Sequence, residues 1–557
     1  MATEAAQVPP GTHNAGGRSL RRIVFGTSAG TIFEAYDFIL FGSLAPIISR
    51  QFFSAVNETT AFIFALLTFA AGFAVRPLGA LLFGRMGDKT GRKRTFIITI
   101  TLMGLSTFAI GLLPSYASVG IAAPVALIAL RMLQGLAYGG EYGGAVVYAA
   151  EHAPQHQRGL YVGWIQTAAG FALFMSFLVI YVARTLFGEA TFEAWGWRVP
   201  FLISIGLLVI SLWIRLTLEE SPMFRKMVEE GRNSKAPLRE AFLRWSNLKL
   251  VLLVLFSLMS VQGVVFYTAH FYSQFFLTQI LKVDGATVTF VMMVVTAISV
   301  FLYVALSWLS DRIGRKVIIL SGTILSVVTA FPFFHALTSA ANPAVAAAQA
   351  AAPVAVVADP AQCALQFDPV GQASFVSSCD IAKSALARRG VSYKNRAAPA
   401  GALAVVEIGN QRLESVEGRG LDPRALGEVR TAFLTRLNAA LTAAGYPERA
   451  DPAQVNVVYV TILILLMVTF STMVYAPMAA MAIEVFPTRI RYSALSLPYH
   501  IGSGWFGGFL PAIAFAMVAG TGDIYFGLWY PVAVAALGAV VLAFGLPETK
   551  DRDINRL

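Results

Sequence analysis

Residues 84–94 read Gly-Arg-Met-Gly-Asp-Lys-Thr-Gly-Arg-Lys-Arg and lie between two apolar runs of membrane-spanning length. A shorter copy, Ser-Asp-Arg-Ile-Gly-Arg-Lys, occupies residues 310–316. Each copy follows a long apolar segment, contains glycine and one acid, and ends in arginine and lysine. We interpret both as basic turns between membrane helices, and their recurrence predicts two related halves.

The composition excludes a soluble globular protein. Of 557 residues, 57% are hydrophobic and only 13% are charged, so the chain has more apolar surface than a soluble core can bury. A net charge of +11 could indicate nucleic-acid binding, but the basic residues stand at the ends of apolar runs rather than on one soluble face. No nucleic-acid partner is therefore expected, and the expected environment is the lipid bilayer.

Hydropathy predicts twelve spans of about 20 residues each, because that length crosses the hydrocarbon core as a helix. The expected fold is all-α, with twelve transmembrane helices in two six-helix bundles. The predicted spans are 23–48, 60–84, 95–114, 122–149, 160–184, 198–216, 248–277, 286–309, 317–338, 456–483, 494–519 and 525–545.

The distribution of arginine and lysine predicts the orientation. The connections after the even-numbered spans are rich in basic residues, whereas the opposite loops hold little more than Arg50, Arg184 and Lys282. Because basic loops stay on the cytoplasmic side, both termini are expected there. Residues 1–17 do not resemble a cleavable signal peptide, so the first span is expected to be retained.

These spans divide the chain into six predicted parts. The two bundles are joined by a charged linker, and a long polar insert separates spans nine and ten on the extracytoplasmic side. The parts are a cytoplasmic tail 1–22, a first bundle 23–216, a linker 217–247, a second bundle 248–338 and 456–545, an insert 339–455 and a cytoplasmic tail 546–557.

The insert contains both cysteines of the chain, Cys363 and Cys379. Because the insert is assigned to an oxidising compartment, the two suggest a local disulfide, with two unpaired thiols as the alternative. Residues 379–390 and 424–444 are predicted to be helical, and 402–408 to form a strand. The sequence leaves the role of the insert open, and a decoration without a part in transport is the plainer interpretation.

Ionisable side chains inside the first two spans are candidates for function because a charge is costly at bilayer depth. Glu34 and Asp37 are three residues apart and share one helix face, where they could exchange a proton. Arg76 lies in the middle of span two, before Pro77. It could hold a substrate carboxylate or pair with a span-one carboxylate. The alternative for the two acids is a structural pair satisfied by arginines or hydroxyls of neighbouring helices.

Span four carries the densest group of polar residues. Gly135, Gly139 and Gly143 recur every four residues and predict close helix packing, which leaves the polar residues unexplained. Arg131 is expected to tune the protonation of an acid, and Glu141 to hold an arginine of the basic turn. Two further residues of this span, Gln134 and Tyr138, are candidate substrate contacts.

Spans seven, ten and eleven add weaker candidates. Gln262, Tyr267 and Tyr499 could line a cavity, although an aromatic belt at the membrane interface explains some of these tyrosines equally well. Glu484 closes span ten and is expected to pair with a basic turn. Metal-ligand spacings, a phosphate-binding loop and a nucleophile elbow were not found, so neither an enzyme nor a cofactor is expected.

With these residues together, the chain resembles the major facilitator superfamily and, within it, the metabolite:proton symporter branch. The resemblance covers nearly all of the chain except the insert. Residues 84–94 look like the family's loop between helices two and three, with 310–316 as the counterpart. The motifs that carry the branch are Glu34–Asp37, Arg76–Gly79, Gly139–Glu141, Glu151–Pro154, Trp197–Phe201, Glu219–Pro222 and Glu484–Arg489.

The resemblance implies a mechanism and a set of gating residues. Members of this branch import small organic acids or, as an alternative, zwitterionic osmolytes such as proline or betaine, across the bacterial inner membrane. Two bundles would rock around a central site, and the expected protein is a monomer whose partners are the substrate, protons and lipid. A membrane sensor is a less favoured alternative. The implied gating residues are Gly84, Asp88, Arg92, Glu141, Asp311, Arg315 and Glu484.

Overall fold

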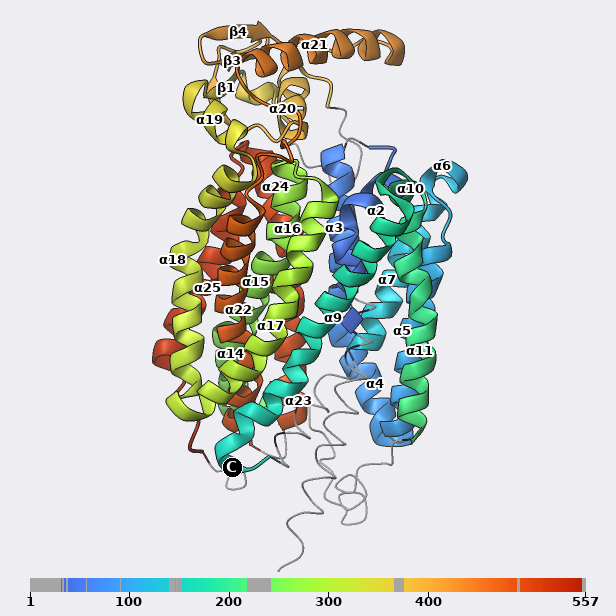
Figure 1. Ribbon diagram of the computed structural model, residues 1–557, viewed down its shortest axis with the longest axis vertical. Helices are drawn as coiled ribbons and strands as arrows, with labels where there is room; N and C mark the ends of the chain where they lie inside the picture. Colours follow the sequence, from blue (N-terminus) through green and yellow to red (C-terminus); the bar gives the residue numbers. More distant parts are fainter. Residues whose placement is uncertain are drawn as a thin grey trace, which may run out of the picture.

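The computed structural model describes residues 32, 35–36, 39–56, 58–90, 92–139, 146, 150, 153–217, 242–364, 375–487 and 491–552. It consists of two bundles of long helices side by side, with a small α/β unit over one end of the second bundle (Figure 1). The end with the α/β unit is called the insert face, and the end where residues 546–552 lie is called the tail face. The predicted tail 1–22 and most of the linker 217–247 lie outside the described residues.

The first bundle contains the helices up to Thr217. Span one is described only in part, and its last section is α2. The elements are α2 (Ala45–Phe52), α3 (Glu58–Ala74), α4 (Arg76–Thr90), α5 (Arg92–Leu112), α6 (Tyr116–Val119), α7 (Ala122–Tyr138), η1 (Gln155–Gln157), α9 (Arg158–Phe187), α10 (Glu189–Ala194), η2 (Gly196–Arg198) and α11 (Val199–Thr217).

The second bundle begins at Trp245, and its first span alternates between α- and π-helical turns. The elements are α14 (Trp245–Val254), η3 (Leu255–Met259), α15 (Ser260–Tyr267), η4 (Thr268–Tyr272), α16 (Ser273–Phe275), η5 (Phe276–Ile280), α17 (Gly285–Ile313), α18 (Arg315–Ala341), α22 (Val457–Val485), α23 (Arg491–Tyr499), η7 (His500–Gly507), α24 (Leu510–Thr521), η8 (Phe526–Leu528) and α25 (Trp529–Gly545).

The helices agree with the predicted membrane fold. Within the described residues, nine helices are long and apolar enough to cross a membrane, and two shorter apolar helices occupy Ile97–Leu112 and Ala122–Tyr138. These eleven coincide with predicted spans two to twelve, and predicted span one, 23–48, lies mostly outside the described residues. The count of twelve is therefore consistent with the structure.

The basic junction at 84–94 is described on both sides of residue 91, which lies outside the described residues. Helix α4 continues to Thr90 and α5 begins at Arg92, so the described residues of this stretch belong to the two flanking helices. The copy at 310–316 does turn at one residue, Gly314, whose φ of 114° is in the region that favours glycine. Glycine spacing and charge marked the right junctions, but they did not reveal how far the flanking helices run.

The insert is an α/β unit, whereas its sequence predicted two helices and one strand. Both helices and that strand are confirmed as α20 (Ser378–Arg388), α21 (Pro423–Ala443) and β3 (Val405–Ile408). The unpredicted elements are α19 (Pro343–Ala351), β1 (Val354–Ala358), η6 (Pro360–Gln362), β2 (Tyr393–Ala397) and β4 (Gln411–Glu414). The sheet order is β2-β1-β3-β4, with β1 and β2 parallel and the other pairs antiparallel.

A separate apolar core stabilises the insert. Strands β1 and β3 contribute valines, α20 contributes Ile381 and Leu386, and α21 contributes Phe433 and Leu437. Cys363 and Cys379 are joined by a disulfide, which ties the residue after η6 to the first turn of α20. Because this core is distinct from that of the bundles, the insert holds its shape by its own contacts.

Reduction of the disulfide should loosen the insert without unfolding the bundles. The bond closes a loop with a sequence separation of 16, for which loop entropy predicts about 3 kcal/mol of stabilisation. We expect dithiothreitol to accelerate tryptic cleavage after Arg388 and Arg389. The paired Cys363→Ala and Cys379→Ala variant should be cleaved fast with or without reductant, and equal cleavage of the parent protein under both conditions would contradict this expectation.

Candidate functional site

Close packing of α7 on α3 and α4 places two polar side chains at the centre of the protein. A Cβ atom added to Gly135 would lie 1.8 Å from the carbonyl oxygen of Gly72, and one added to Gly139 would lie 2.1 Å from that of Arg76. The predicted packing role of these two glycines is therefore confirmed. As a result, the Arg76 guanidinium lies between the Tyr138 ring at 3.9 Å and the Phe73 ring at 4.2 Å.

Arg131 is fully buried one level further along α7. Its Nη1 donates to Gln134 Oε1 at 2.5 Å, and Gln134 Nε2 donates to Thr107 Oγ1 at 2.6 Å. The guanidinium also lies 4.4 Å from the centre of the Phe41 ring. Gln134 thus orients Arg131. Its Oε1 acceptor and one Nε2 donor are already engaged in these two hydrogen bonds and are not free to contact a substrate.

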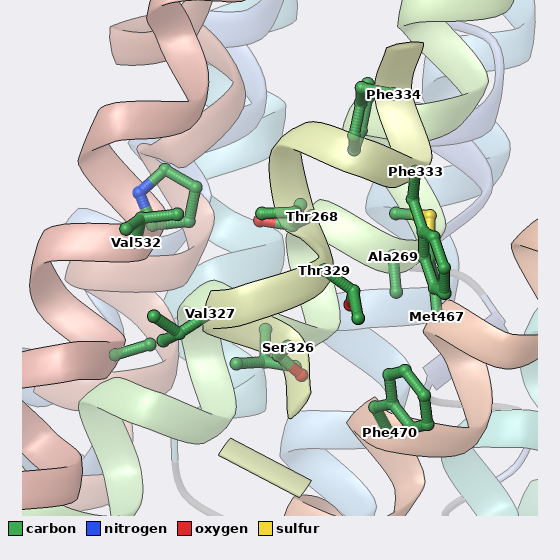
Figure 2. Close-up of a pocket in the computed structure, with 14 residues that line it drawn as sticks. Thr268, Ala269, Ser326, Val327, Thr329, Phe333, Phe334, Met467, Phe470 and Val532 are labelled. Carbon is green, nitrogen blue, oxygen red and sulfur yellow. The ribbon is translucent and has the colours of Figure 1, made fainter. Parts of the chain in front are cut away.

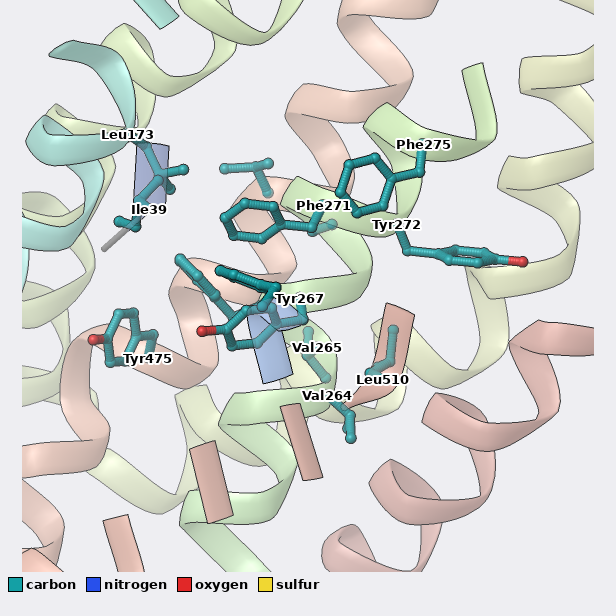
Figure 3. Close-up of a cluster of buried hydrophobic side chains, with 14 of the residues drawn as sticks. Ile39, Leu173, Val264, Val265, Tyr267, Phe271, Tyr272, Phe275, Tyr475 and Leu510 are labelled. Atoms are coloured by element: carbon teal, nitrogen blue, oxygen red, sulfur yellow. The ribbon is translucent and has the colours of Figure 1, made fainter. Parts of the chain in front are cut away.

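The second bundle completes this centre with aromatic rings. The Tyr267 ring contacts Phe73 at 5.4 Å and Phe271 at 5.3 Å, and Gly507 lies against its other side. Figure 3 shows the hydroxyl groups of Tyr267 and Tyr475 on one side of the cluster, whereas the Tyr272 hydroxyl points to the opposite side. The centre therefore combines two guanidinium groups of the first bundle with tyrosines of the second.

The remaining predicted cavity residues lie around this centre. The Tyr499 hydroxyl lies 3.3 Å from that of Tyr475, which contacts the centre through Phe266. Gln262, five residues before Tyr267, is buried, and its Oε1 has no hydrogen-bond partner among the described residues. A buried amide oxygen without a partner is costly, so Gln262 is available to a ligand or a proton donor.

Several predicted residues cannot be placed. Glu34, Asp37 and Glu141 lie outside the described residues. Gly84, Asp88 and Arg92 are described only by their helical backbone. The roles proposed for these six residues stay predictions.

At the tail face, Asp311 joins the two bundles. Its Oδ1 and Oδ2 accept the backbone N–H groups of Gly159 and Leu160, both at 2.8 Å. These groups open α9, so the carboxylate caps a helix of the other bundle, where the positive end of the helix dipole favours an anion. Arg315 Nη2 holds the same carboxylate at 2.7 Å.

Glu484 makes a second connection beside the first. Its Oε1 accepts from Arg158 Nη1 of the first bundle at 2.9 Å and from Arg315 Nη2 of the second at 3.2 Å. Its Oε2 accepts from Thr549 Oγ1 at 2.6 Å. The carboxylate is fully buried, so its charge depends on protein donors such as these three rather than on water.

Glu548 supports this group from within the second bundle. It accepts the backbone N–H groups of Arg315 at 2.9 Å and Lys316 at 3.0 Å, and so caps α18. These and further backbone hydrogen bonds outweigh its partial burial and lower the pKa of Glu548. The structure therefore brings together three of the predicted gating residues, Asp311, Arg315 and Glu484.

Sequence reasoning did not predict Arg158, Glu548 or Thr549 as members of this group. Arg158 lies in the basic connection after span four, and the two others lie in the predicted tail 546–557. Their position in the sequence could have indicated this role, because each stands at the tail-face end of a span, where charges from several helices must meet. Their partners are 65 to 326 residues away in the chain, which no local pattern encodes.

The bundles also meet at the insert face, mainly through apolar contacts. The Phe62 ring of α3 packs edge-on against Phe275 at 5.3 Å and Phe515 at 5.0 Å. Gln274 Nε2 donates to the carbonyl oxygen of Ser43 at 3.1 Å. Contacts between the bundles are therefore present at both ends.

A pocket of about 40 Å³ lies elsewhere, inside the second bundle (Figure 2). It is lined by side chains of η4, α18, α22 and α25, such as Thr268, Phe333 and Met467. Its lining is mostly apolar, and none of the predicted substrate residues belongs to it. The residues that could recognise a polar solute are those between the bundles.

Comparisons with known proteins agree with this arrangement. The Major Facilitator Superfamily model matches residues 27–374, and the Sugar (and other) transporter model matches residues 430–557. The chain is 35% identical to the shikimate transporter of Escherichia coli K12, with 57% of this chain and 72% of the relative covered. It is also 35% identical to the proline/betaine transporter of the same strain, but spans only 65% of its length, with 58% of this chain covered.

Solved structures show the same fold at lower identity. The xylose transporter XylE from Escherichia coli, in a partially occluded inward-open conformation, matches with a TM-score of 0.59 and 16% identity. The match covers 96% of this chain and 99% of XylE. At that identity the likeness supports the fold.

The substitution Glu484→Gln should loosen the tail face because it removes the charge that holds Arg158 and Arg315 together. Breaking a buried ion pair costs about 3–5 kcal/mol. With Ser310→Cys as a reporter buried beside Gly159, we expect maleimide labelling to become at least about tenfold faster.

The matched control is Glu548→Gln, which removes a cap inside one bundle and no contact between bundles. It should leave the labelling rate of the Ser310→Cys reporter near that of the parent. Equal acceleration by both substitutions would mean that Glu484 does not act between the bundles.

Proposed function

The chain belongs to the major facilitator superfamily, and from that premise we propose that it imports a small organic acid together with protons. It is a multi-pass membrane transporter and not an enzyme. We place the tail face in the cytoplasm, because the basic junctions lie there, and the insert on the outer side of a bacterial inner membrane. The name of an inner membrane metabolite transport protein of Escherichia coli K12, 34% identical over 331 residues, supports the inner membrane as the location.

The observation that carries the proposal is the pair of guanidinium groups between the bundles. Arg76 and Arg131 are 4% and 0% exposed, and both contact aromatic rings of the same cluster. Two buried cations attract an anionic solute strongly, because few water molecules screen them. Arginine also binds carboxylates through two parallel hydrogen bonds.

The aromatic rings give the site its second property. Phe73 and Tyr138 stack against the Arg76 guanidinium and contribute to its stabilisation. Because such contacts cost little to exchange, a carboxylate could draw Arg76 from its rings without leaving it unstabilised. The name of the shikimate transporter supports a small organic acid as the substrate class.

A zwitterionic osmolyte is the second candidate, and the same rings favour it. Aromatic side chains around a small space suit a quaternary ammonium, and Phe69, Phe73, Tyr138 and Tyr267 provide four such rings. The names of relatives that transport proline and betaine support this candidate at equal identity. The two candidates differ in whether the substrate carries a net negative charge.

The contacts at both ends support transport by alternating access. Ion pairs connect the bundles at the tail face, and aromatic contacts connect them at the insert face. For a solute to enter or leave the central site, one face must open while the other stays closed. We propose that Asp37, with Glu34 and Arg131, carries the coupled proton. Proton and substrate together would then favour the switch more strongly than either alone.

Uptake into proteoliposomes under an inward proton gradient tests the substrate class. We expect accumulation of an organic acid such as shikimate, and little accumulation of betaine. The reverse pattern would replace the first candidate by the second, and no accumulation of either would contradict both.

Arg76→Lys and Arg131→Lys should separate charge from geometry. Each keeps the positive charge but loses the bidentate hydrogen bonding to a substrate carboxylate. A hydrogen bond to a charged group is worth about 1.5–3 kcal/mol. We expect KM for the acid to rise about tenfold or more. Arg50→Lys, at an exposed ion pair with Glu193, is the control and should leave KM unchanged.

The substitution Asp37→Asn should uncouple transport from the proton gradient. A neutral amide mimics the protonated carboxyl group, so substrate should still exchange across the membrane but should no longer accumulate. Comparison of counterflow with gradient-driven uptake measures this difference. Gradient-driven accumulation that persists in the variant would show that another group carries the proton.

A further inference from the structure

The insert leaves and rejoins the second bundle at one point. The Asn456 N–H, at the end of the insert, donates to the carbonyl oxygen of Ala340, near its beginning, at 2.9 Å. Asn342 Nδ2 donates to Leu281 O at 3.0 Å, and the Ala450 N–H donates to Lys282 O at 3.2 Å. Both ends of the insert are therefore fixed to the loop between η5 and α17.

This loop is specialised for the contact. Lys282 is the only non-glycine residue with a positive φ in the part of the chain that the structure describes, at 57°. A side chain in the left-handed region costs about 1 kcal/mol or more, so surrounding contacts must maintain it. The hydrogen bond from Ala450 is one such contact.

Strand β2 fixes the insert to a second loop of the same bundle. The Tyr393 N–H donates to Gly522 O at 3.0 Å, and Asn395 Nδ2 donates to Thr521 O at 2.6 Å. The Tyr393 ring fills the space where a Cβ atom of Gly522 would lie. With backbone hydrogen bonds to two loops, the insert must move with the second bundle as one body.

Helix α20 reaches across to the first bundle, where it packs against α3. One face of α20 belongs to the insert core through Ile381, Ala382 and Ala385. At 100° per residue, Asp380, Lys383 and Ser384 form the opposite face, and all three are buried as well. Asp380 Oδ1 accepts the backbone N–H of Ala364, which belongs to the insert, at 2.9 Å, and α3 is the partner of α20 outside the insert.

The face of α20 that is turned away from the insert core is polar, unlike the core face. Lys383 is 9% exposed and makes no hydrogen bond or ion pair within the described ranges. Burial lowers its pKa, although the nearby Asp380 partly opposes this effect. When this polar face separates from α3, water hydrates its side chains, which lowers the free energy needed to break the contact.

We propose that α20 is the outer gate of this transporter: the insert, carried by the second bundle, closes the extracytoplasmic mouth by resting α20 on α3. The insert then has a part in transport and is not a decoration. When the bundles separate at the insert face, α20 lifts away from α3, and the face that contains Lys383 and Ser384 becomes accessible to water. The proposal rests on alternating access but not on any particular substrate.

Thiol labelling from outside tests the gate in the full chain. The two native cysteines are bonded to each other, so an introduced cysteine is the only free thiol. Ser384→Cys probes the gate face, Ala382→Cys the insert core on the same helix, and Lys394→Cys an exposed position on β2. With a membrane-impermeant maleimide, we expect fast labelling at 394, none at 382 and slow labelling at 384.

The state of the tail face should control the rate at position 384. Adding Glu484→Gln favours opening at the tail face and so closure at the insert face. It should slow labelling at 384 by roughly tenfold and leave the rate at 394 unchanged. Three results would overturn the proposal, whichever substrate is carried. The labelling rate at 384 could be the same with and without Glu484→Gln, it could equal the rate at 394, or it could be zero in both backgrounds.

The variant Lys383→Met gives an independent test. It removes the charge that favours separation, so the gate should stay closed for longer, and both labelling at 384 and uptake should fall several-fold. Lys394→Met removes an exposed lysine of the same insert and should change neither rate. Unchanged labelling in Lys383→Met, with the insert intact by trypsin digestion, would mean that this face does not open.

Discussion

The structure depends on one buried carboxylate, Glu484, which is held at once by an arginine of each bundle. In a site with little water, that carboxylate is stable only while Arg158, Arg315 and Thr549 all donate to it. Asp311 adds a helix cap between the same bundles. We therefore expect the tail face to alternate between two arrangements, one with every donor in place and one in which water replaces them. A partly open arrangement would leave charges buried without partners, which is the costliest outcome.

The tail face, the insert face and the centre between them are held together by different kinds of contact, and these differences suit their proposed roles in transport. The tail face is closed by ion pairs and the insert face by phenylalanine contacts together with the polar face of α20. Between them, Arg76 and Arg131 lie against aromatic rings of the first bundle, and one of these rings, Phe73, contacts Tyr267 of the second bundle. Cations stacked on rings can change partners without crossing a large barrier, which suits a site that must bind a solute and then release it.

Much of the fold could be predicted because lipid imposes a simple rule: each span must be an apolar helix of fixed length. Charges inside or at the ends of spans likewise marked Asp311, Arg315 and Glu484. Arg158 and Thr549 were missed because their pairing depends on helices far apart in the chain. The insert obeys weaker rules. Strands β2 and β4 read Tyr-Lys-Asn-Arg-Ala and Gln-Arg-Leu-Glu and are mostly exposed, so they form only because β1 and β3 pair with them.

The most direct test of the account is a pair of distances between spin labels, measured by pulsed electron resonance in lipid discs. One pair, at Glu193 and Lys394, spans the insert face, and the other, at Leu216 and Val317, spans the tail face. When acid pH and substrate are varied, the account predicts that one distance lengthens as the other shortens, in the same fraction of molecules. Distances that lengthen together, or that do not respond, would contradict alternating access between the two faces.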